Sequence, residues 1–389
     1  MIVLRQAELY APERLGRQDL LIAGGTIVAM ASRLPDLPAA LGAAEIDLGG
    51  LRVIPGLIDG HVHLTGGGGE AGPHTRVPPL TVTALTAGGI TTAIGVLGTD
   101  DAVRTTAELV TVARGLRQLG VSAWCLTGGY HLPPTTLSGT VRGDIALIDE
   151  IIGVGEVAIS DHRSSQPTLD DLLRLASEAH VGGLMSGKAG IVHLHVGDGT
   201  RGLELVRQAL DTSELPARVF NPTHVNRKKV LFSEAMELVE RGPTIDITAF
   251  PVEDGEDAWT AEDALERYWD GGLPAERVTV SSDGGGCLPR FDGDGRVAGM
   301  DVGAPGALMG MVATLLARGR PLEQVLPPVT SNVAELLRLP GKGRLRVGAD
   351  ADLVVLTTDH AVRHVMARGR WHRFDGRPRI QGPFEKEDS

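Results

Sequence analysis

The sequence predicts an α/β protein in which a (β/α)8 barrel carries a small β-sandwich made from both ends of the chain. Three observations predict this fold. Short alternating segments broken by glycine and proline fill the first 53 residues, eight β-rich runs then alternate with helical stretches, and the last part of the chain returns to β-rich sequence. Eight βα units within about 280 residues are typical of a barrel of parallel strands.

The two ends of the chain have the pattern of antiparallel strands and turns. Residues 19–31, DLLIAGGTIVAMA, show it near the N-terminus, and residues 344–377 show it near the C-terminus. The simplest arrangement joins both ends, so we predict a β-sandwich domain from residues 1–53 and 340–389 and a barrel domain from residues 54–339. The final GPFEKEDS has the character of a frayed tail.

The middle of the chain supplies the predicted barrel strands. Helical patterns, such as those of residues 102–120 and 229–242, fall between the β-rich runs. In a barrel of this kind the C-terminal ends of the strands meet at one mouth, where active sites form. The eight runs are residues 53–64, 89–98, 121–130, 154–162, 190–198, 217–225, 243–250 and 277–285.

The composition limits the partners and the compartment. The chain has 389 residues, 22% of them charged, and a formal net charge of −12, which describes a soluble globular protein. The negative charge argues against nucleic acid or an anionic membrane as a partner. Only two cysteines occur, and we find neither a signal peptide nor an apolar run of about 18 residues. These features predict a cytoplasmic protein.

The strongest local signal is the segment GLIDGHVHL. His61 and His63 lie two residues apart on a predicted strand, so both side chains point to the same face. That face is the barrel lumen at the mouth. Taken alone, the pair is equally compatible with a metal site and with two histidines that make only structural hydrogen bonds.

Further polar residues end four other predicted strands. Glu156 lies alone in the apolar run IIGVGEVAIS, where a buried carboxylate is costly unless it is paired or bound to a metal. His193 and His195 end the fifth strand, His224 the sixth and Asp283 the eighth. Loop capping does not explain five strands that end this way. Because imidazole and carboxylate are the usual ligands of zinc and similar ions, the pattern predicts a metal centre at the mouth.

These motifs resemble the amidohydrolase superfamily and, more closely, its isoaspartyl dipeptidase family. The resemblance covers about residues 54–300 and continues more weakly into GKGRLRVGADADLVVL. It implies metal-dependent hydrolysis of the isopeptide bond of β-aspartyl dipeptides by a large homo-oligomer, such as an octamer. The segments that carry it are, in order, HVHLTGGGGEAGP, LGTD, TGGYH, SDHRS, HVGD, PTHVNR, TIDIT and SSDGGG.

The resemblance implies two divalent metal ions, with zinc expected, but one bridging ligand departs from the family. The family's fourth strand carries a carboxylated lysine, and this chain has Glu156 there and no lysine in residues 121–187. Glutamate also offers two oxygens on one carbon, on a shorter stem, and an extra residue in GVGEV can supply the missing reach. The alternative is that Glu156 binds one ion or none. The implied ligands are His61, His63 and Glu156 for one ion, and Glu156, His195 and His224 for the other, and Asp283 is also expected among the metal-binding residues.

The implied catalytic roles fall to two residues. Asp283 takes the proton of a metal-bridging hydroxide as general base and returns it to the leaving amine as general acid. Tyr130 donates a hydrogen bond to the developing oxyanion. The alternative for Tyr130 is a structural hydrogen bond.

The implied substrate contacts come from loops at the mouth. Arginines suit the two free carboxylates of a β-aspartyl dipeptide, and an acid suits its free amine. The alternative is ordinary surface ion pairing. Cys287 stands where the family has a serine, which affects substrate preference, and His193 is expected to pack behind the ligands. The implied substrate-binding residues are Glu70, Thr99, Arg163, Arg227 and Cys287.

Two other functions remain open on the sequence. A related amidohydrolase acting on another N-acyl amino acid or on a cyclic amide would share the metal ligands. A relative without catalytic activity is disfavoured, because His61, His63, His195, His224 and Asp283 are all retained.

Overall fold

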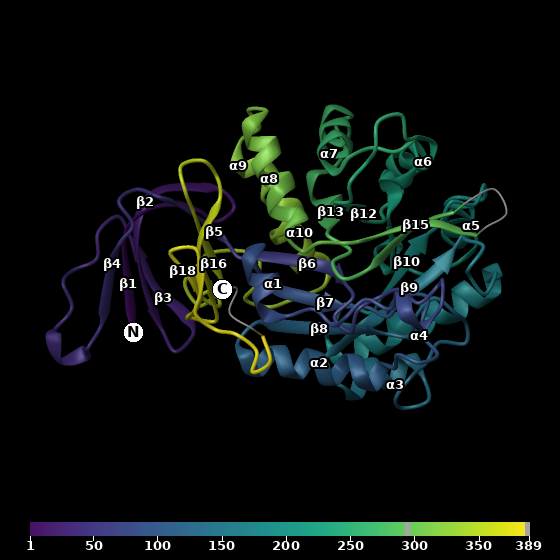
Figure 1. Ribbon diagram of the computed structural model, residues 1–389, viewed down its shortest axis with the longest axis horizontal. Helices are drawn as coiled ribbons and strands as arrows, with labels where there is room; N and C mark the ends of the chain where they lie inside the picture. Colours follow the sequence, from purple (N-terminus) through teal and green to yellow (C-terminus); the bar gives the residue numbers. More distant parts are fainter. Residues whose placement is uncertain (292–295, 386–389) are drawn as a thin grey trace.

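The computed structural model describes residues 1–291 and 296–385 and contains the predicted barrel (Figure 1). Strands β6 to β11 form a six-stranded parallel sheet, and β12 pairs in parallel with β13. A parallel bridge between Val62 and Gly284 closes the ring from the last strand to the first. The prediction of eight barrel strands is therefore confirmed. They are β6 (Leu57–Val62), β7 (Ile90–Gly95), β8 (Ser122–Thr127), β9 (Ile151–Ile159), β10 (Ile191–Val196), β11 (Phe220–Thr223), β12 (Ile245–Thr248) and β13 (Val278–Ser281).

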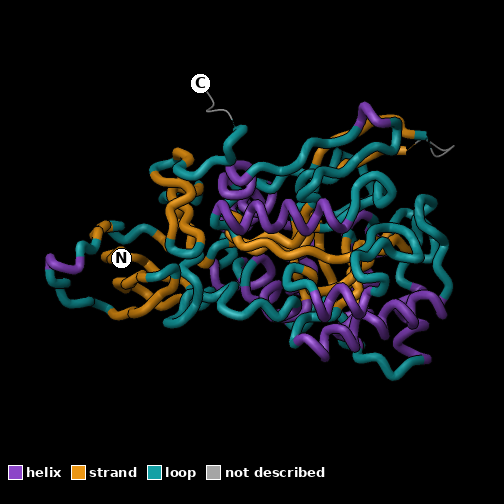
Figure 2. Tube along the Cα trace, turned by 90° about the horizontal axis from the view of Figure 1, so that it is seen from below, coloured by secondary structure: helices purple, strands orange, loops and turns teal. Residues whose placement is uncertain are grey.

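Helices cover the outside of these strands (Figures 1 and 2). None of those in the described part of the chain combines the length and apolar character that crossing a membrane requires. The helices are α1 (Val82–Ala87), α2 (Thr106–Leu119), α3 (Val141–Leu147), α4 (Leu169–Ser186), α5 (Glu204–Thr212), α6 (Lys229–Val239), α7 (Ala261–Asp270), α8 (Ala307–Ala317), α9 (Leu322–Val325) and α10 (Ser331–Leu336).

Helix α2 shows how the sequence specifies such an element. Thr105 caps its start by accepting a hydrogen bond from the Glu108 amide, and Gly120 ends it in the left-handed conformation. Leu109, Ala113 and Leu116 follow helical spacing and are buried against the barrel.

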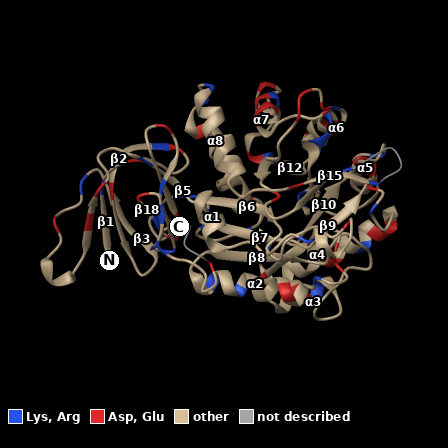
Figure 3. Cartoon of the chain, in the orientation of Figure 1, with Lys and Arg blue, Asp and Glu red and all other residues tan. Residues whose placement is uncertain are grey.

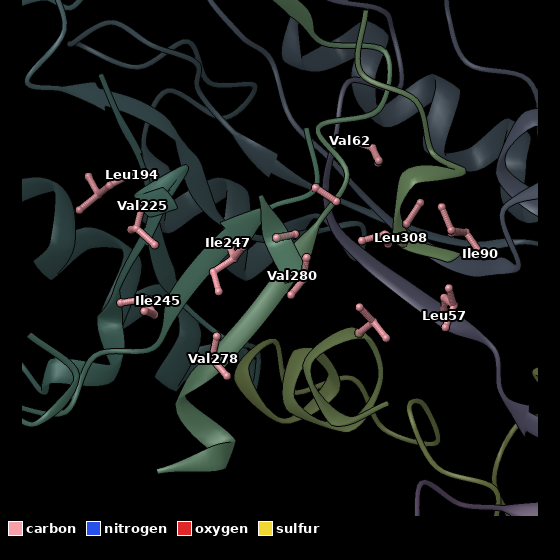
Figure 4. Packing of buried hydrophobic residues seen from close by; sticks show 14 of the residues in the cluster. Leu57, Val62, Ile90, Leu194, Val225, Ile245, Ile247, Val278, Val280 and Leu308 are labelled. Carbon is pink, nitrogen blue, oxygen red and sulfur yellow. The ribbon is translucent and has the colours of Figure 1, made fainter. Parts of the chain in front are cut away.

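The core lies between the strands and the helices. Figure 4 shows branched aliphatic side chains from β6, β7, β12, β13 and α8 packed together. Strands β7 and β8 carry no charged side chain, whereas charged residues are frequent on the helices that cover the barrel (Figure 3). The barrel is therefore held mainly by apolar burial, and polar residues gather at its ends.

The two ends of the chain form one nine-stranded sheet beside the barrel, with its own buried cluster that includes Leu4, Leu20 and Met366. Strand β5 pairs with β16, which joins the N-terminal strands to the C-terminal ones as expected. The strands are β1 (Ile2–Tyr10), β2 (Arg14–Ala23), β3 (Thr26–Ala31), β4 (Ala44–Asp47), β5 (Arg52–Pro55), β16 (Leu353–Leu356), β17 (Val362–Ala367), β18 (Arg370–Phe374) and β19 (Arg377–Pro378).

The predicted frayed tail is held at one point. The Glu385 carboxylate accepts hydrogen bonds from the amides of Val82 and Thr83 at 3.0 and 3.3 Å. A carboxylate is favourable there because the first amides of a helix have no partner within the helix. The expectation is therefore wrong for Glu385, and residues 386–389 lie outside the described part of the chain.

A buried lysine connects the barrel to the terminal sheet. The Lys342 side chain is only 2% exposed, and its Nζ lies 2.6 Å from Asp352 Oδ2 and 2.7 Å from Asp350 Oδ2. It also donates to the Ser122 hydroxyl, at the start of β8, at 2.6 Å. One ammonium group thus ties the bottom of the barrel to the segment that enters β16.

We predict that Lys342→Met destabilises the protein by about 3–5 kcal/mol, because it leaves buried Asp352 without its cation. Arg344→Met is the matched control. It breaks a pair with Glu13 whose side chains are 37% and 64% exposed, and should cost at most about 1 kcal/mol. Urea unfolding followed by circular dichroism measures both. Equal shifts in the two midpoints would contradict the role of Lys342.

Candidate active site

A bulge in strand β9 places Glu156 at the mouth of the barrel. Val154 pairs with Val192 and Val157 pairs with Leu194, so Gly155 and Glu156 together face His193 alone. A bulge of this kind inserts one residue and redirects the neighbouring side chain. The extra residue expected in GVGEV therefore lies next to Glu156, whose side chain is shorter than a carboxylated lysine.

Glycine is required at position 155. Its φ is +151°, and an added Cβ would lie 2.7 Å from the His193 carbonyl oxygen and 2.8 Å from the His193 Cβ. Both distances are shorter than real Cβ contacts allow. The close approach of β9 to β10 at the bulge thus depends on the missing side chain.

The two oxygens of Glu156 face two different pairs of histidines. Oε1 lies 3.6 Å from His61 Nε2 and 3.4 Å from His63 Nε2. Oε2 lies 3.0 Å from His195 Nδ1 and 3.4 Å from His224 Nε2. The carboxylate is 1% exposed and is surrounded by four imidazoles, which is the arrangement a bridging ligand needs.

Asp283 completes the cluster from the end of β13. Its Oδ1 lies 3.0 Å from His63 Nε2 and 3.4 Å from His61 Nε2. The ligand atoms fall into three groups, each compact enough to hold an ion. These groups are His61, His63 and Glu156; His61, His224 and Asp283; and Glu156, His195 and His224.

The electrostatics of the cluster suit a cation. Burial raises the pKa of the Asp283 carboxyl, but the facing imidazoles of His61 and His63 outweigh burial and hold it below its usual range. Burial also raises the pKa of Glu156, but the facing histidines outweigh burial and hold this pKa well below its usual value. For His224, burial lowers the pKa to about 3. Anionic carboxylates beside a neutral imidazole are the protonation states in which these groups bind a metal.

Two buried atoms of the cluster test whether a metal fits. His61 Nε2 and Asp283 Oδ1 have no hydrogen-bond partner within the described residues. Buried polar atoms are normally satisfied, so unpartnered ones at a site require an explanation. Imidazole nitrogens and carboxylate oxygens are the donor set of zinc and similar ions. A divalent cation at the cluster would satisfy both atoms.

Tyr130 reaches the same cluster from the loop after β8. Its hydroxyl lies 2.8 Å from His195 Nδ1, and the side chain is buried. Burial, together with the charge of Glu156, raises the Tyr130 pKa well above its ordinary value. The phenol therefore stays protonated and can donate a hydrogen bond.

Asp161 also belongs to the site, although it was not predicted. Its carboxylate lies 3.1 Å from His195 Nε2 and forms a two-pronged pair with Arg163, at 3.0 and 2.8 Å. Asp161 thus holds a predicted metal ligand and a predicted substrate arginine at once. It lies two residues after the end of β9, so the rule that selected the other residues, a polar side chain after a barrel strand, applies to it as well.

The predicted substrate residues line one cavity of about 200 Å³ with Tyr130 and Glu156. Arg163 Nη1 lies 3.5 Å from Glu70 Oε1, to which the Thr99 hydroxyl also donates, at 3.2 Å. The other oxygen of Glu70, Oε2, is buried and has no hydrogen-bond partner within the described residues.

The remaining two predicted substrate residues, Arg227 and Cys287, line the same cavity. Arg227 donates to the Val196 carbonyl at 3.0 Å. Cys287 begins the hairpin of β14 (Cys287–Phe291) and β15 (Val297–Val302) after the last barrel strand. Burial raises the pKa of its thiol to about 12, so Cys287 offers a neutral thiol to a ligand.

His193 is the one predicted polar residue at a strand end that does not face a carboxylate of the cluster. Its Nε2 lies 2.8 Å from His61 Nδ1, on the side of His61 away from Glu156. It therefore packs behind a predicted ligand, as expected.

Comparison with known proteins identifies the family. The model of the amidohydrolase family matches residues 52–372. This chain belongs to the amidohydrolase family. It is 39% identical to the β-aspartyl dipeptidase of Fervidobacterium islandicum AW-1, solved in complex with a β-Asp-Leu dipeptide. That match covers 99% of this chain and 98% of the other, with a TM-score of 0.92.

A second structure of the same dipeptidase and two more distant relatives are also similar to this chain. A second structure of the Fervidobacterium dipeptidase is 37% identical, over 99% of this chain and 100% of that one, with a TM-score of 0.88. The allantoinase of Deinococcus radiodurans is 27% identical, over 96% of this chain and 90% of that enzyme. A D-hydantoinase from a Thermus species, 18% identical with a TM-score of 0.66 over 98% of this chain and 97% of that one, shares the fold. This amidohydrolase is thus a hydrolytic enzyme with a metal-binding cluster at its mouth.

We predict that Gly155→Ala lowers the affinity of the cluster for a divalent ion, with zinc as the probe, at least tenfold, because the added methyl group displaces Glu156. Overpacking should also cost about 1–3 kcal/mol of stability. Gly310→Ala in α8 is the matched control, since its Cβ meets nothing within 4 Å and alanine favours the helix. Competition with a chromophoric chelator measures affinity. Unchanged zinc binding by Gly155→Ala would rule out the bulge as the feature that places Glu156.

Proposed function

We propose that this amidohydrolase hydrolyses the isopeptide bond of β-aspartyl dipeptides. The observation that carries the proposal is the unpartnered Oε2 of Glu70, buried in the cavity that Arg163 and Arg227 also line. A β-aspartyl dipeptide has one free amine and two free carboxylates. The buried oxygen suits the amine, and the two guanidinium groups suit the carboxylates. The similarity to the Fervidobacterium dipeptidase supports the same substrate class.

We propose that the cluster holds two divalent ions, with zinc as the metal, and that Glu156 bridges them. His61, His63 and Glu156 would hold one ion, and Glu156, His195 and His224 the other. When bound, the ions supply Lewis acidity toward the scissile carbonyl and the attacking water. A glutamate in this position, unlike a carboxylated lysine, would need no carbon dioxide to form the site.

The protein's own groups move the protons and bind the developing charge. The Asp283 carboxylate is held ionised, so it can accept the proton of the attacking water as the C–O bond forms. It then gives this proton to the amide nitrogen as the C–N bond breaks, so that the leaving group departs as a neutral amine. Tyr130, which stays protonated, donates to the carbonyl oxygen as that oxygen becomes negative.

The proposal extends to assembly and location. The resemblance to the isoaspartyl dipeptidase family supports a large homo-oligomer such as an octamer. The presence of only two cysteines and the net charge of −12 support a cytoplasmic enzyme whose partner is a small dipeptide.

Substrate competition tests the proposed activity. We expect kcat/KM for β-Asp-Leu to exceed that for α-Asp-Leu at least 100-fold, because only the β-linkage places the amine on Glu70 while both arginines hold carboxylates. Glu70→Gln, which keeps the shape and removes the charge, should lower kcat/KM for β-Asp-Leu at least tenfold. Allantoin and hydantoin serve as cyclic-amide competitors. Equal turnover of both dipeptides, or faster turnover of a cyclic amide, would overturn the proposal.

The role of Asp283 is tested by Asp283→Asn. We expect kcat to fall by about 10²–10⁴, because the amide cannot take the proton of the attacking water. Thermal unfolding should show that the fold is retained, since asparagine has nearly the same volume. A rate within threefold of the unaltered enzyme would contradict the assignment.

A further inference from the structure

Four polar groups connect the start of β12 to the metal cluster through the barrel interior. The Asn221 Nδ2 donates to the Thr244 carbonyl at 2.8 Å, and the Asn221 Oδ1 lies 2.7 Å from His193 Nδ1. His193 Nε2 lies in turn 2.8 Å from His61 Nδ1. The chain of contacts therefore crosses from β12 through β11 and β10 to β6.

The Thr244 carbonyl determines which atoms donate and which accept along this chain of hydrogen bonds. A backbone carbonyl can only accept, so the amide NH₂ of Asn221 must face Thr244 and its oxygen must face His193. His193 Nδ1 then carries a hydrogen, and a neutral His193 has a lone pair on Nε2. That lone pair accepts the hydrogen on His61 Nδ1, which leaves His61 Nε2 free to bind a cation.

The reverse direction is unfavourable. Turning the Asn221 amide around would place two oxygens 2.8 Å apart in the barrel interior. Asn221 and His193 are each 2% exposed, so water does not relieve the repulsion. The unpartnered His61 Nε2 is the atom that faces Glu156 and Asp283, in agreement with the direction set by Thr244.

We propose that the Thr244 carbonyl, Asn221 and His193 are positioning groups that fix the tautomer and ring orientation of His61. Partners behind a metal-ligating histidine hold its ring in place and leave the lone pair on the correct nitrogen. The effect on metal affinity rests on the proposed metal site, whereas the tautomer of His193 does not. His61 Nδ1 keeps its hydrogen whether Nε2 bears a proton or a metal ion.

Nitrogen NMR of the protein labelled with ¹⁵N-histidine tests the tautomer directly. Spectra of the zinc-loaded and the zinc-stripped protein should both show His193 protonated on Nδ1 alone, with its signals assigned by their loss in His193→Gln. Spectra that show His193 protonated on Nε2, or on both nitrogens, would overturn the inference. The tautomer is read from the unaltered protein, and His193→Gln serves only to assign the His193 signals.

Variants test the consequence for the metal. His193→Leu and Asn221→Leu should each weaken zinc binding about 10- to 100-fold. His193→Gln, whose amide can still accept from His61 and donate to Asn221, should stay within about threefold of the unaltered protein. His372→Leu is the control, because His372 is fully buried in the terminal sheet away from the cluster.

The outcomes separate this inference from the proposed activity. Unchanged zinc affinity in His193→Leu would overturn the positioning role, even if β-aspartyl dipeptides are cleaved. Conversely, failure to cleave these dipeptides would overturn the proposed substrate and leave the tautomer result standing.

Discussion

The mouth of this amidohydrolase is organised around the carboxylate of Glu156, which is almost completely buried. Such a charge is costly in the interior unless opposite charge or strong hydrogen bonding compensates for it. Here histidines from β6, β10 and β11 approach its two oxygens, two on each side. The bulge, the glycine before the glutamate and the groups behind the histidines all serve to hold this arrangement.

The barrel brings these residues together because its first and last strands meet. Asp59 of β6 accepts hydrogen bonds from the Ser282 amide, at 3.1 Å, and from the Ser282 hydroxyl. It also accepts from the His61 amide at 3.3 Å. Asp59 thus fixes the backbone beside one predicted ligand and beside Asp283, although the two lie more than 200 positions apart in the sequence. Burial raises the pKa of the Asp59 carboxyl to about 7.

Local sequence patterns were sufficient for the barrel and for most of its mouth. The alternation of short β-rich runs with helical stretches locates the strands, and a polar residue after an apolar run indicates where His195, His224 and Asp283 lie. The pattern cannot show which oxygen of Glu156 faces which histidine, since that depends on contacts between strands far apart in the chain. Asp161 follows the same rule, but its role depends on the contact with His195 from β10, which the segment SDHRS alone does not reveal.

The sequence also does not predict which atoms donate and which accept in the hydrogen bonds behind His61. His193 is recognisable as a histidine two residues before a ligand, but its partners come from two other strands. The tail is a similar case, because a short polar segment looks disordered until the helix that Glu385 contacts is known. Local residue types therefore predict which elements form the site, and the closed barrel determines how their side chains pair.

Anomalous diffraction at the zinc absorption edge, from crystals of the zinc-loaded protein, tests the bridging role of Glu156 most directly. We expect two peaks in each chain, one beside Oε1 with His61 and His63, and one beside Oε2 with His195 and His224. Each metal–oxygen distance should be about 2.0–2.2 Å. A single peak, or two peaks that do not each contact a different oxygen of Glu156, would contradict this account of the site.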